Sequence, residues 1–262
     1  MAFFRKLNRM SADLLVRHQH RKIELEGTLN CRDLGGLRTI DGRTTRRGVV
    51  YRSDALATLT PAAQARFADL GIRSVFDLRS TEERTRAPNQ LPAGPVQHAA
   101  GFLPKGNPEM FAAVNGGRLN VAETRATMLG QYERLILDHT DRLRQVYRGL
   151  LGEPGVPALI HCASGKDRTG VAIAVLLLAV GVARDEVLED YYLSNYQRRP
   201  VDLFVGSAQA EAVEQIMCAV PEYLEAALVA AERKFGSFDA YLRDGVGLSD
   251  LERAALAARL VA

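Results

Sequence analysis

The sequence predicts an α/β fold: a central, mostly parallel sheet flanked by helices, with a helical C-terminal third. Three observations support this prediction. Short apolar segments alternate with helical patterns over the first 170 residues. One of these segments leads through a tight loop into a long apolar helix, which is typical of α/β proteins with a site at the carboxyl end of a strand. Beyond Gly181 the chain is helical almost to its end.

The elements up to residue 122 follow from local signals. Thr60 and Pro61 start a helix of about ten residues, since threonine caps a helix and proline suits its first turn. The apolar residues 72–78 and 95–100 predict two short strands, the first of them buried. Residues 101–122 are rich in Gly, Pro and Asn, which predicts a long loop.

The rest of the chain contains one further predicted strand. Long helical periodicity covers residues 123–151, and the apolar residues 157–162 predict the strand. Residues 170–181 are apolar but too few to cross a bilayer, so they predict a buried helix. The later predicted helices cover residues 184–198, about 207–218, 221–235, 237–244 and 249–261.

The composition is that of a folded globular protein. Hydrophobic residues make up 47% and charged residues 25% of the 262 positions, which excludes a disordered chain. No linker separates two halves, so we expect a single domain over residues 1–262. It includes a basic N-terminal extension of about residues 1–22 and C-terminal helices over about residues 200–262.

Charge and cysteine content bear on partners and compartment. The net charge of +3 is too small to indicate nucleic acid. Residues 1–52 contain 12 Lys and Arg against 5 Asp and Glu, which suits either solvent or weak contact with an anionic membrane. Three cysteines predict no disulfide framework, and the N-terminus shows no signal peptide. We therefore expect a cytoplasmic protein, with export by another route left open; the sequence indicates no oligomeric state.

The loop between the last strand and the apolar helix has the residues for phosphate chemistry. Residues 161–170 have the sequence His-Cys-Ala-Ser-Gly-Lys-Asp-Arg-Thr-Gly. A short loop entering a helix turns backbone N–H groups toward an anion, and the helix dipole adds to that attraction. Gly165 permits a sharp turn, Arg168 supplies a planar two-pronged donor and Lys166 a point charge. The predicted phosphate-binding residues are Ala163, Ser164, Gly165, Lys166, Asp167 and Arg168.

The same loop provides a nucleophile. A helix N-terminus beside Arg and Lys favours the thiolate form of a cysteine, so Cys162 is expected to be reactive. A thiolate at the floor of a phosphate site can attack phosphorus. A nucleotide-binding P-loop is excluded, because Asp167 follows Gly165-Lys166 where that motif needs Ser or Thr. That motif also needs a glycine at position 160, which is Ile160.

The segments around this loop resemble a known family. Residues 161–170 are similar to the Cys-x5-Arg loop of the protein tyrosine phosphatase superfamily, in the form found in bacterial tyrosine/serine and phosphoinositide phosphatases. Similar segments cover most of residues 25–260; they include residues 30–36, 41–43, 50–56, 75–80 with Glu83, 190–195 and 236–242. The resemblance implies a cysteine-phosphatase α/β fold, a phosphorylated protein or phosphoinositide as substrate, and no metal or organic cofactor.

The resemblance also implies residue roles. Cys162 attacks phosphorus to form a phosphocysteine, which water then hydrolyses, while Arg168 and the loop amides stabilise the charge. The Trp-Pro-Asp loop that supplies the acid in many members is absent, since the chain has no tryptophan. Asp167 is therefore the candidate general acid. Asp77 is the second carboxylate, with an orienting role such as holding Arg168, and the two roles could be exchanged.

Further residues support the loop in this family. His161 orients the backbone around the cysteine, and Thr169 or Ser164 assists departure of the sulfur. The apolar stretches 203–205 and 216–218 of the C-terminal helices are either core or, by resemblance, part of a lid that limits access to the site.

Other interpretations stay open. A phosphate- or phosphoinositide-binding protein without activity has a similar loop, but it usually lacks the Cys or the Arg, and both are present here. Sulfurtransferases and arsenate reductases also use a cysteine loop, and the extended resemblance argues against both. Cys31 stands where the family motif has Phe; it is either a core residue or the partner of Cys162 in a protective disulfide.

Overall fold

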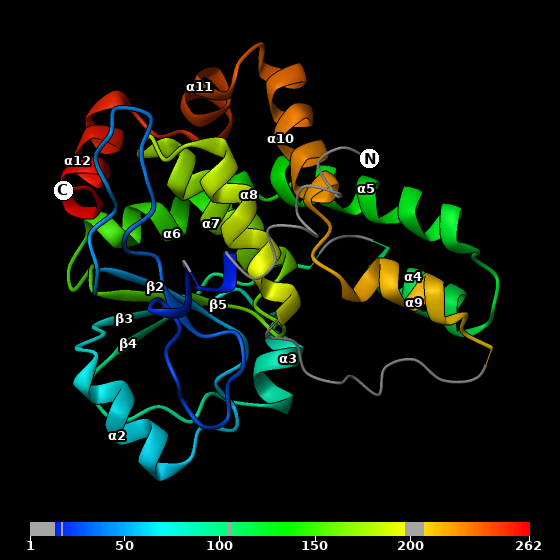
Figure 1. Ribbon diagram of the computed structural model, residues 1–262, viewed down its shortest axis with the longest axis horizontal. Helices are drawn as coiled ribbons and strands as arrows, with labels where there is room; N and C mark the ends of the chain where they lie inside the picture. Colours follow the sequence, from blue (N-terminus) through cyan, green and yellow to red (C-terminus); the bar gives the residue numbers. More distant parts are fainter. Residues whose placement is uncertain (1–13, 17, 104–105, 197–206) are drawn as a thin grey trace.

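A five-stranded sheet forms the centre of the molecule (Figure 1). The computed structural model describes residues 14–16, 18–103, 106–196 and 207–262. The strand order is β1-β2-β5-β3-β4, with β1 antiparallel to β2 and the other pairs parallel. The strands are β1 (Arg32–Asp33), β2 (Val50–Ser53), β3 (Ser74–Asp77), β4 (Val96–Ala99) and β5 (Ala158–His161). The predicted mostly parallel sheet is confirmed.

Helices cover the sheet and form the C-terminal part of the chain (Figure 1). Before β5 they are α2 (Pro61–Asp69), α3 (Thr81–Arg86), α4 (Asn107–Asn115), α5 (Val121–Leu137) and α6 (Thr140–Leu151). After β5 they are α7 (Asp167–Ala179), α8 (Arg184–Tyr192), the 3-10 helix η1 (Leu193–Tyr196), α9 (Ala210–Met217), α10 (Pro221–Phe235), α11 (Phe238–Ala240), the π-helix η2 (Tyr241–Val246) and α12 (Asp250–Leu260). The α/β class with a helical C-terminal part is confirmed.

Side chains alternate between the two faces of the sheet, as the period of a strand requires. On β3, Val75 lies in one apolar cluster and Phe76 in another, and on β5 Leu159 and Ile160 divide in the same way. Phe67 of α2 belongs to the smaller cluster, on the Val75 face. The larger cluster, on the other face, contains side chains of α5, α6, α7, α8 and α10.

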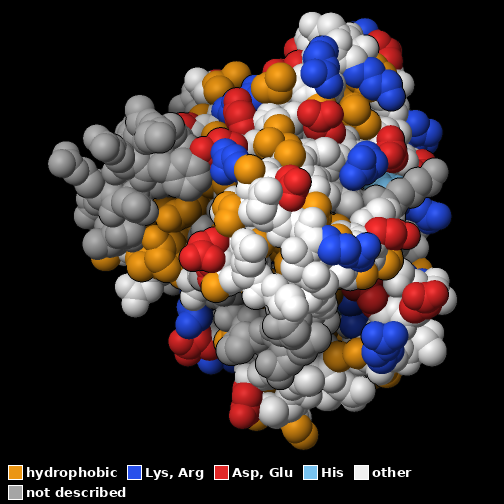
Figure 2. Space-filling model, turned by 90° about the vertical axis from the view of Figure 1, so that its right-hand side faces the viewer, with side chains coloured by type: hydrophobic (Ala, Val, Ile, Leu, Met, Phe, Trp, Pro, Cys, Tyr) orange, Lys and Arg blue, Asp and Glu red, His pale blue; other side chains and the backbone are white. Residues whose placement is uncertain are grey.

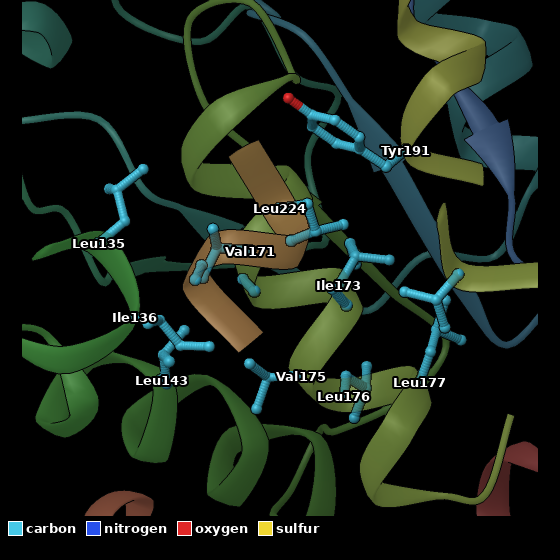
Figure 3. Close-up of a cluster of buried hydrophobic side chains, with 14 of the residues drawn as sticks. Leu135, Ile136, Leu143, Val171, Ile173, Val175, Leu176, Leu177, Tyr191 and Leu224 are labelled. Carbon is cyan, nitrogen blue, oxygen red and sulfur yellow. The ribbon is translucent and has the colours of Figure 1, made fainter. Parts of the chain in front are cut away.

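Helix α7 lies inside the larger cluster. All of residues 171–177 are buried. Figure 3 shows Val171 and Val175 on the side of α7 that faces Ile136 and Leu143, from α5 and α6. Burying one such side chain completely contributes about 1.5–3 kcal/mol. The apolar packing of α7 therefore anchors the loop that precedes it.

Most predicted elements are present with shifted ends. Helix α2 and strands β3, β4 and β5 lie where they were expected, and α10 has the predicted bounds. The helix predicted over residues 123–151 is divided into α5 and α6, because His139 between them has the non-helical angles φ −124° and ψ 30°. The helix predicted over residues 237–244 is α11 followed by the π-helix η2. Strands β1 and β2 and helix α3 lie outside the predicted elements.

The prediction of a long loop over residues 101–122 is wrong in part, because α4 lies within it. Pro108 stands in the first turn of α4, where proline is well tolerated, and the helix buries Met110 and Val114. The Gly, Pro and Asn content of this segment therefore marks the start and end of a helix rather than a continuous loop.

On the face seen in Figure 2, Lys and Arg side chains are interspersed with Asp and Glu. Among the helices of the described ranges, none has both the length and the apolar character needed to cross a membrane. The basic N-terminal segment expected to contact a membrane lies mostly outside the described residues, as does the apolar segment 203–205.

Candidate active site

The loop predicted to bind phosphate connects β5 to α7. Strand β5 is the middle strand of the sheet, between β2 and β3, so the loop lies at the carboxyl end of that strand. Cys162 directly follows the strand and is only 1% exposed, whereas Ala163 and Ser164 are exposed. Cys162 is therefore at the floor of the loop, and the two residues after it form its rim.

The carbonyl groups of the loop are bonded to the surrounding protein. The side-chain amide of Asn30 donates to the carbonyl oxygens of Ser164 at 3.1 Å and Gly165 at 3.2 Å. Arg52 Nη2 donates to the Gly165 carbonyl at 2.6 Å. The Ala163 carbonyl accepts a backbone hydrogen bond at 3.1 Å from the segment after β2. Hydrogen bonds from the surrounding protein to its carbonyl oxygens thus hold the loop in place.

The N–H groups of the same loop remain available. Among the described residues, no acceptor receives a hydrogen bond from the backbone N–H groups of residues 163–168. Gly165 makes the turn with φ +65°, and a Cβ there would lie 2.6 Å from the Ser53 carbonyl oxygen. Unbonded N–H groups at a helix N-terminus attract an anion. This geometry supports the interpretation of the loop as a phosphate site.

Glu83 of α3 holds the guanidinium of Arg168. Arg168 Nη1 lies 2.6 Å from Glu83 Oε2, and Nη2 lies 2.7 Å from Oε1. Nη1 also donates to the carbonyl oxygens of Leu78 at 3.2 Å and Phe102 at 3.3 Å. Burial alone would lower the pKa of Arg168, but the hydrogen bonds to Glu83 and the negative charge of that carboxylate raise it. The guanidinium is therefore charged, and its plane is fixed.

The start of α3 fixes Glu83 in turn. Ser80 caps this helix: its hydroxyl accepts a hydrogen bond from the Glu83 N–H at 3.2 Å. In return, Glu83 Oε2 accepts one from the Ser80 N–H at 2.7 Å, which completes a capping box. Burial would raise the pKa of Glu83, but the hydrogen bonds from Arg168 hold it below its usual value. One carboxylate thus both starts a helix and orients Arg168.

Asp77 does not hold Arg168, which corrects one role expected for it. Asp77 is 2% exposed, and its Oδ2 lies 2.7 Å from Arg79 Nη2 and 3.5 Å from His161 Nε2. The reason is local: Asp77 ends β3, and Arg79, two residues later, turns back onto it. Burial would raise the pKa of Asp77, but the side-chain and backbone hydrogen bonds from Arg79, together with the charge of its guanidinium, hold it below its usual value.

His161 lies beneath the loop as a neutral ring. It is completely buried, and this burial lowers the pKa of His161 to about 4, against the raising effect of Asp77. Its Nδ1 lies 3.3 Å from the Cys162 carbonyl oxygen. A ring that is uncharged at pH 7 and in contact with the backbone of the cysteine suits the orienting role that the family resemblance implies.

Asp167 and Lys166 lie side by side at the start of α7, with the Asp167 side chain 32% exposed. Tyr132 donates its hydroxyl proton to Asp167 Oδ1 at 2.5 Å, and Lys166 Nζ lies 3.2 Å from the same oxygen. Lys166 also donates to the carbonyl oxygens of Ile216, in the last turn of α9, and, at 3.3 Å, of Cys218, directly after that helix. The ammonium that was expected at the phosphate is therefore bound by the C-terminal helices.

Three buried arginines surround Asp190 behind the loop. Nitrogen atoms of Arg21, Arg32 and Arg52 lie 2.8, 3.0 and 2.6 Å from its carboxylate, and all these side chains are 1% exposed. Burial alone would raise the pKa of Asp190, but the three guanidinium groups hold it well below its usual value. Because three guanidinium groups surround one carboxylate, net positive charge remains behind Gly165. Arg52 is the guanidinium that donates to the Gly165 carbonyl oxygen.

The other predicted residues lie as follows. Thr169 is completely buried, and its Oγ1 has no hydrogen-bond partner in the described part of the chain. None of the three cysteines forms a disulfide. Cys31 packs with Tyr51 on the α2 face of the sheet, whereas Cys162 belongs to the cluster on the opposite face, which favours core packing for Cys31 over a disulfide. Within the described ranges, no group of three His, Cys, Asp or Glu side chains could hold a metal ion.

A loop of free N–H groups, with a cysteine at its floor and an ion-paired arginine beside it, can bind a phosphoryl group and attack it. The fold and this site are those expected of a phosphatase. Residues 23–262 match the family described as the tyrosine phosphatase family. The chain belongs to this family.

Two known proteins are similar to this chain over most of their length. The chain is 34% identical over 227 residues to a Cupriavidus necator protein named "putative tyrosine-protein phosphatase", an alignment that covers 83% of this chain and 81% of that protein. It is 31% identical over 271 residues to the triple specificity protein phosphatase PtpB of Mycobacterium tuberculosis, covering 88% and 96%. The crystal structure of TpbA from P. aeruginosa aligns with 72% of this chain and 90% of that chain, at 16% identity and a TM-score of 0.31.

Three residues support the loop in ways that were not predicted from the sequence. Glu83 is a partner of Arg168, and the Ser-Thr-Glu-Glu capping box that begins at residue 80 was the available signal. Asp190 lies in a segment that resembles the family, but nothing local indicates its three arginine partners. Tyr132 had no signal, because its position on the apolar side of α5 is that of an ordinary core residue.

Proposed function

We propose that the protein hydrolyses phosphomonoesters through a phosphocysteine on Cys162. The observation that supports this most directly is the loop itself. The N–H groups of residues 163–168 make no hydrogen bond to the rest of the described chain, and Arg168 is held by two charged hydrogen bonds to Glu83. Such a loop stabilises the equatorial oxygens of the phosphoryl group, and the sulfur attacks in line with the leaving oxygen.

In the first step, the Cys162 sulfur forms a bond to phosphorus and the bond from phosphorus to the leaving oxygen breaks. Asp167 gives its proton to that oxygen. Asp167 suits this role better than Asp77, because its side chain is 32% exposed, whereas the Asp77 side chain is 3% exposed and paired with Arg79. Proton transfer of this kind accelerates a reaction by about 10²–10⁴-fold.

In the second step, water attacks the phosphocysteine. The Asp167 carboxylate accepts a proton from this water, the bond between phosphorus and sulfur breaks, and inorganic phosphate leaves. Thr169 Oγ1, buried and without a partner among the described residues, is our candidate for stabilising the returning thiolate. His161, neutral and in contact with the Cys162 carbonyl, orients the backbone of the loop.

Phosphotyrosine in proteins is the proposed main substrate, with phosphoserine, phosphothreonine and phosphoinositides as further classes. The relative from Mycobacterium tuberculosis is named a triple specificity protein phosphatase, which supports this breadth. Lys166 is the residue that would add charge for a phosphoinositide head group. Because carbonyl groups at the C-terminal end of α9 bind its ammonium, phosphopeptides are favoured over lipids. Weak membrane contact, a cytoplasmic location and a lid remain predictions.

The test measures phosphate release from a phosphotyrosine peptide, a phosphoserine peptide and a short-chain phosphoinositide in parallel. Wild type and Cys162→Ser are compared in the presence of EDTA and reductant. We expect turnover by wild type alone, fastest on the phosphotyrosine peptide. The order of the rates separates a protein phosphatase from a lipid phosphatase.

Two results would contradict this proposal. Equal turnover by Cys162→Ser would exclude the phosphocysteine. A folded wild-type protein that binds vanadate but hydrolyses none of the three substrates would instead be a phosphate-binding protein without activity, which is the second candidate function.

A further inference from the structure

Three tyrosines from different helices meet beside Asp167. Tyr132 comes from α5, Tyr191 from α8 and Tyr223 from α10. The ring of Tyr132 is 6.1 Å from that of Tyr191 and 5.6 Å from that of Tyr223, measured between centroids. Tyr132 is completely buried and Tyr191 is 1% exposed. A buried phenol needs a partner for its hydroxyl group, so the bonding of these hydroxyls is informative.

The hydroxyls of Tyr132 and Tyr191 form a chain that ends on Asp167. The Tyr132 oxygen lies 2.5 Å from Asp167 Oδ1 and 2.5 Å from the Tyr191 oxygen. A carboxylate can only accept, so Tyr132 donates its single proton to Asp167, and Tyr191 must donate to Tyr132. Figure 3 shows Tyr191 above Leu224 and Ile173, with its hydroxyl at the end that lies farthest from Ile173. The direction of donation is therefore Tyr191 to Tyr132 to Asp167.

This series of hydrogen bonds ends on only one of the two oxygens of the Asp167 carboxylate. Tyr132 and Lys166 both approach Oδ1, at 2.5 and 3.2 Å. Within the described residues, no hydrogen bond ends on Oδ2. The Asp167 side chain is 32% exposed, so its anchored oxygen faces the protein and its other oxygen remains available.

We propose that Tyr132 is a positioning residue of the phosphatase reaction. Its hydroxyl anchors Oδ1 of Asp167, so that Oδ2 delivers the proton to the leaving oxygen and later accepts the proton of the attacking water. Tyr132 suits this task because its ring is fixed by Tyr191 and Tyr223 on neighbouring helices. This inference rests on the proposed function, since it gives Asp167 the role of general acid.

A positioning role for Tyr132 predicts an effect on the reaction that a purely structural role would not produce. Protonation of the leaving oxygen matters most when the leaving group is a poor one, and little when it departs readily as an anion. Loss of the Tyr132 anchor should therefore slow the first step in proportion to the difficulty of leaving-group departure. A general loosening of the fold would slow all substrates alike.

The experiment compares Tyr132→Phe with Tyr223→Phe as a matched control. Tyr223 undergoes the same change in the same aromatic cluster, but its hydroxyl donates to Gln215 at 3.0 Å rather than to Asp167. The value of kcat/KM is measured on phenyl phosphate, with a poor leaving group, and on 4-nitrophenyl phosphate, with a good one. We expect Tyr132→Phe to lose about 10-fold on phenyl phosphate and less than about 3-fold on 4-nitrophenyl phosphate. Tyr223→Phe should stay close to wild type on both.

A double variant adds a second readout. Because Tyr132 acts through Asp167, adding Tyr132→Phe to Asp167→Asn should cause no further loss on phenyl phosphate. If Tyr132→Phe fails to fold, Tyr191→Phe removes the donor behind it and should give a smaller loss with the same dependence on the leaving group.

The outcomes separate this inference from the proposed function. Equal losses on both substrates, or losses matched by Tyr223→Phe, would overturn the role of Tyr132 while the enzyme itself remained a phosphatase. Absence of turnover by wild type on both substrates would overturn the proposed function, and the inference with it.

Discussion

Replacing Glu83 by glutamine tests how much the reaction depends on the orientation of Arg168. In the structure, both Nη atoms of Arg168 bond to the Glu83 carboxylate, at 2.6 and 2.7 Å. Glutamine keeps one acceptor oxygen and can still cap α3, since Glu and Gln both serve at that position of a capping box. The substitution Glu83→Gln therefore removes one of the two charged hydrogen bonds and leaves the helix start intact.

The magnitude follows from that single lost contact. A hydrogen bond to a charged group contributes about 1.5–3 kcal/mol. Each 1.4 kcal/mol changes a rate or binding constant by about tenfold. If this energy is used to hold Arg168 against the phosphoryl oxygens, kcat/KM should fall by about 10- to 100-fold, and inhibition by vanadate should weaken to a similar extent.

The assay measures kcat/KM on a phosphotyrosine peptide together with the inhibition constant of vanadate. Glu82→Gln is the matched control, because Glu82 is the neighbouring residue on the same helix and is exposed. If Glu83→Gln behaves like Glu82→Gln in both measurements, the ion pair does not orient Arg168 for the reaction and the reasoning is refuted.

Two further predictions concern the support of the loop. Asp190→Asn leaves three buried guanidinium groups without their carboxylate, a loss of about 3–5 kcal/mol that should lower Tm by roughly 6–20 °C at pH 7. Because the folded pKa of Asp190 is lowered, its contribution to stability is present above about pH 4 and is lost as the pH falls further. A Tm of Asp190→Asn within about 2 °C of wild type at pH 7 would contradict the predicted loss of stability. Gly165→Ala forces a Cβ to within 2.6 Å of the Ser53 carbonyl oxygen at φ +65°, so we expect at least about a 10-fold loss of kcat/KM. Gly42→Ala, where φ is +88° and nothing lies within 4 Å of the added atom, should keep its activity, and equal activity of the two variants would count against the role of Gly165.

The fold could be predicted from the sequence where local signals decide the structure. Thr60 and Pro61 start α2 as expected, because a capping side chain and a first-turn proline act within one turn. The break between α5 and α6 was not predictable from periodicity, since the apolar pattern continues across His139 on both sides. The segment 101–122 was predicted to be a long loop, which is wrong in part. Its glycines and prolines lie at the ends of a helix.

The loop of the candidate site was predictable because its residues are consecutive. Cys162 and Arg168 are separated by five residues, and the spacing alone brings them to one anion site between a strand and a helix. Partners from distant segments could not be predicted in this way. Glu83 is 85 residues from Arg168 and Tyr132 is 35 residues from Asp167, and only the packing of α3 and α5 against the loop brings them together.

The phosphocysteine itself provides the most direct test of the proposed function. Wild type, Asp167→Asn and Cys162→Ser are mixed with a phosphotyrosine peptide that contains radiolabelled phosphate, denatured within the first turnover and mapped by proteolysis. The mechanism predicts a covalent label on the peptide that contains Cys162 in wild type and in Asp167→Asn, and none in Cys162→Ser. Turnover without a covalent label, or a label on another residue, would contradict it.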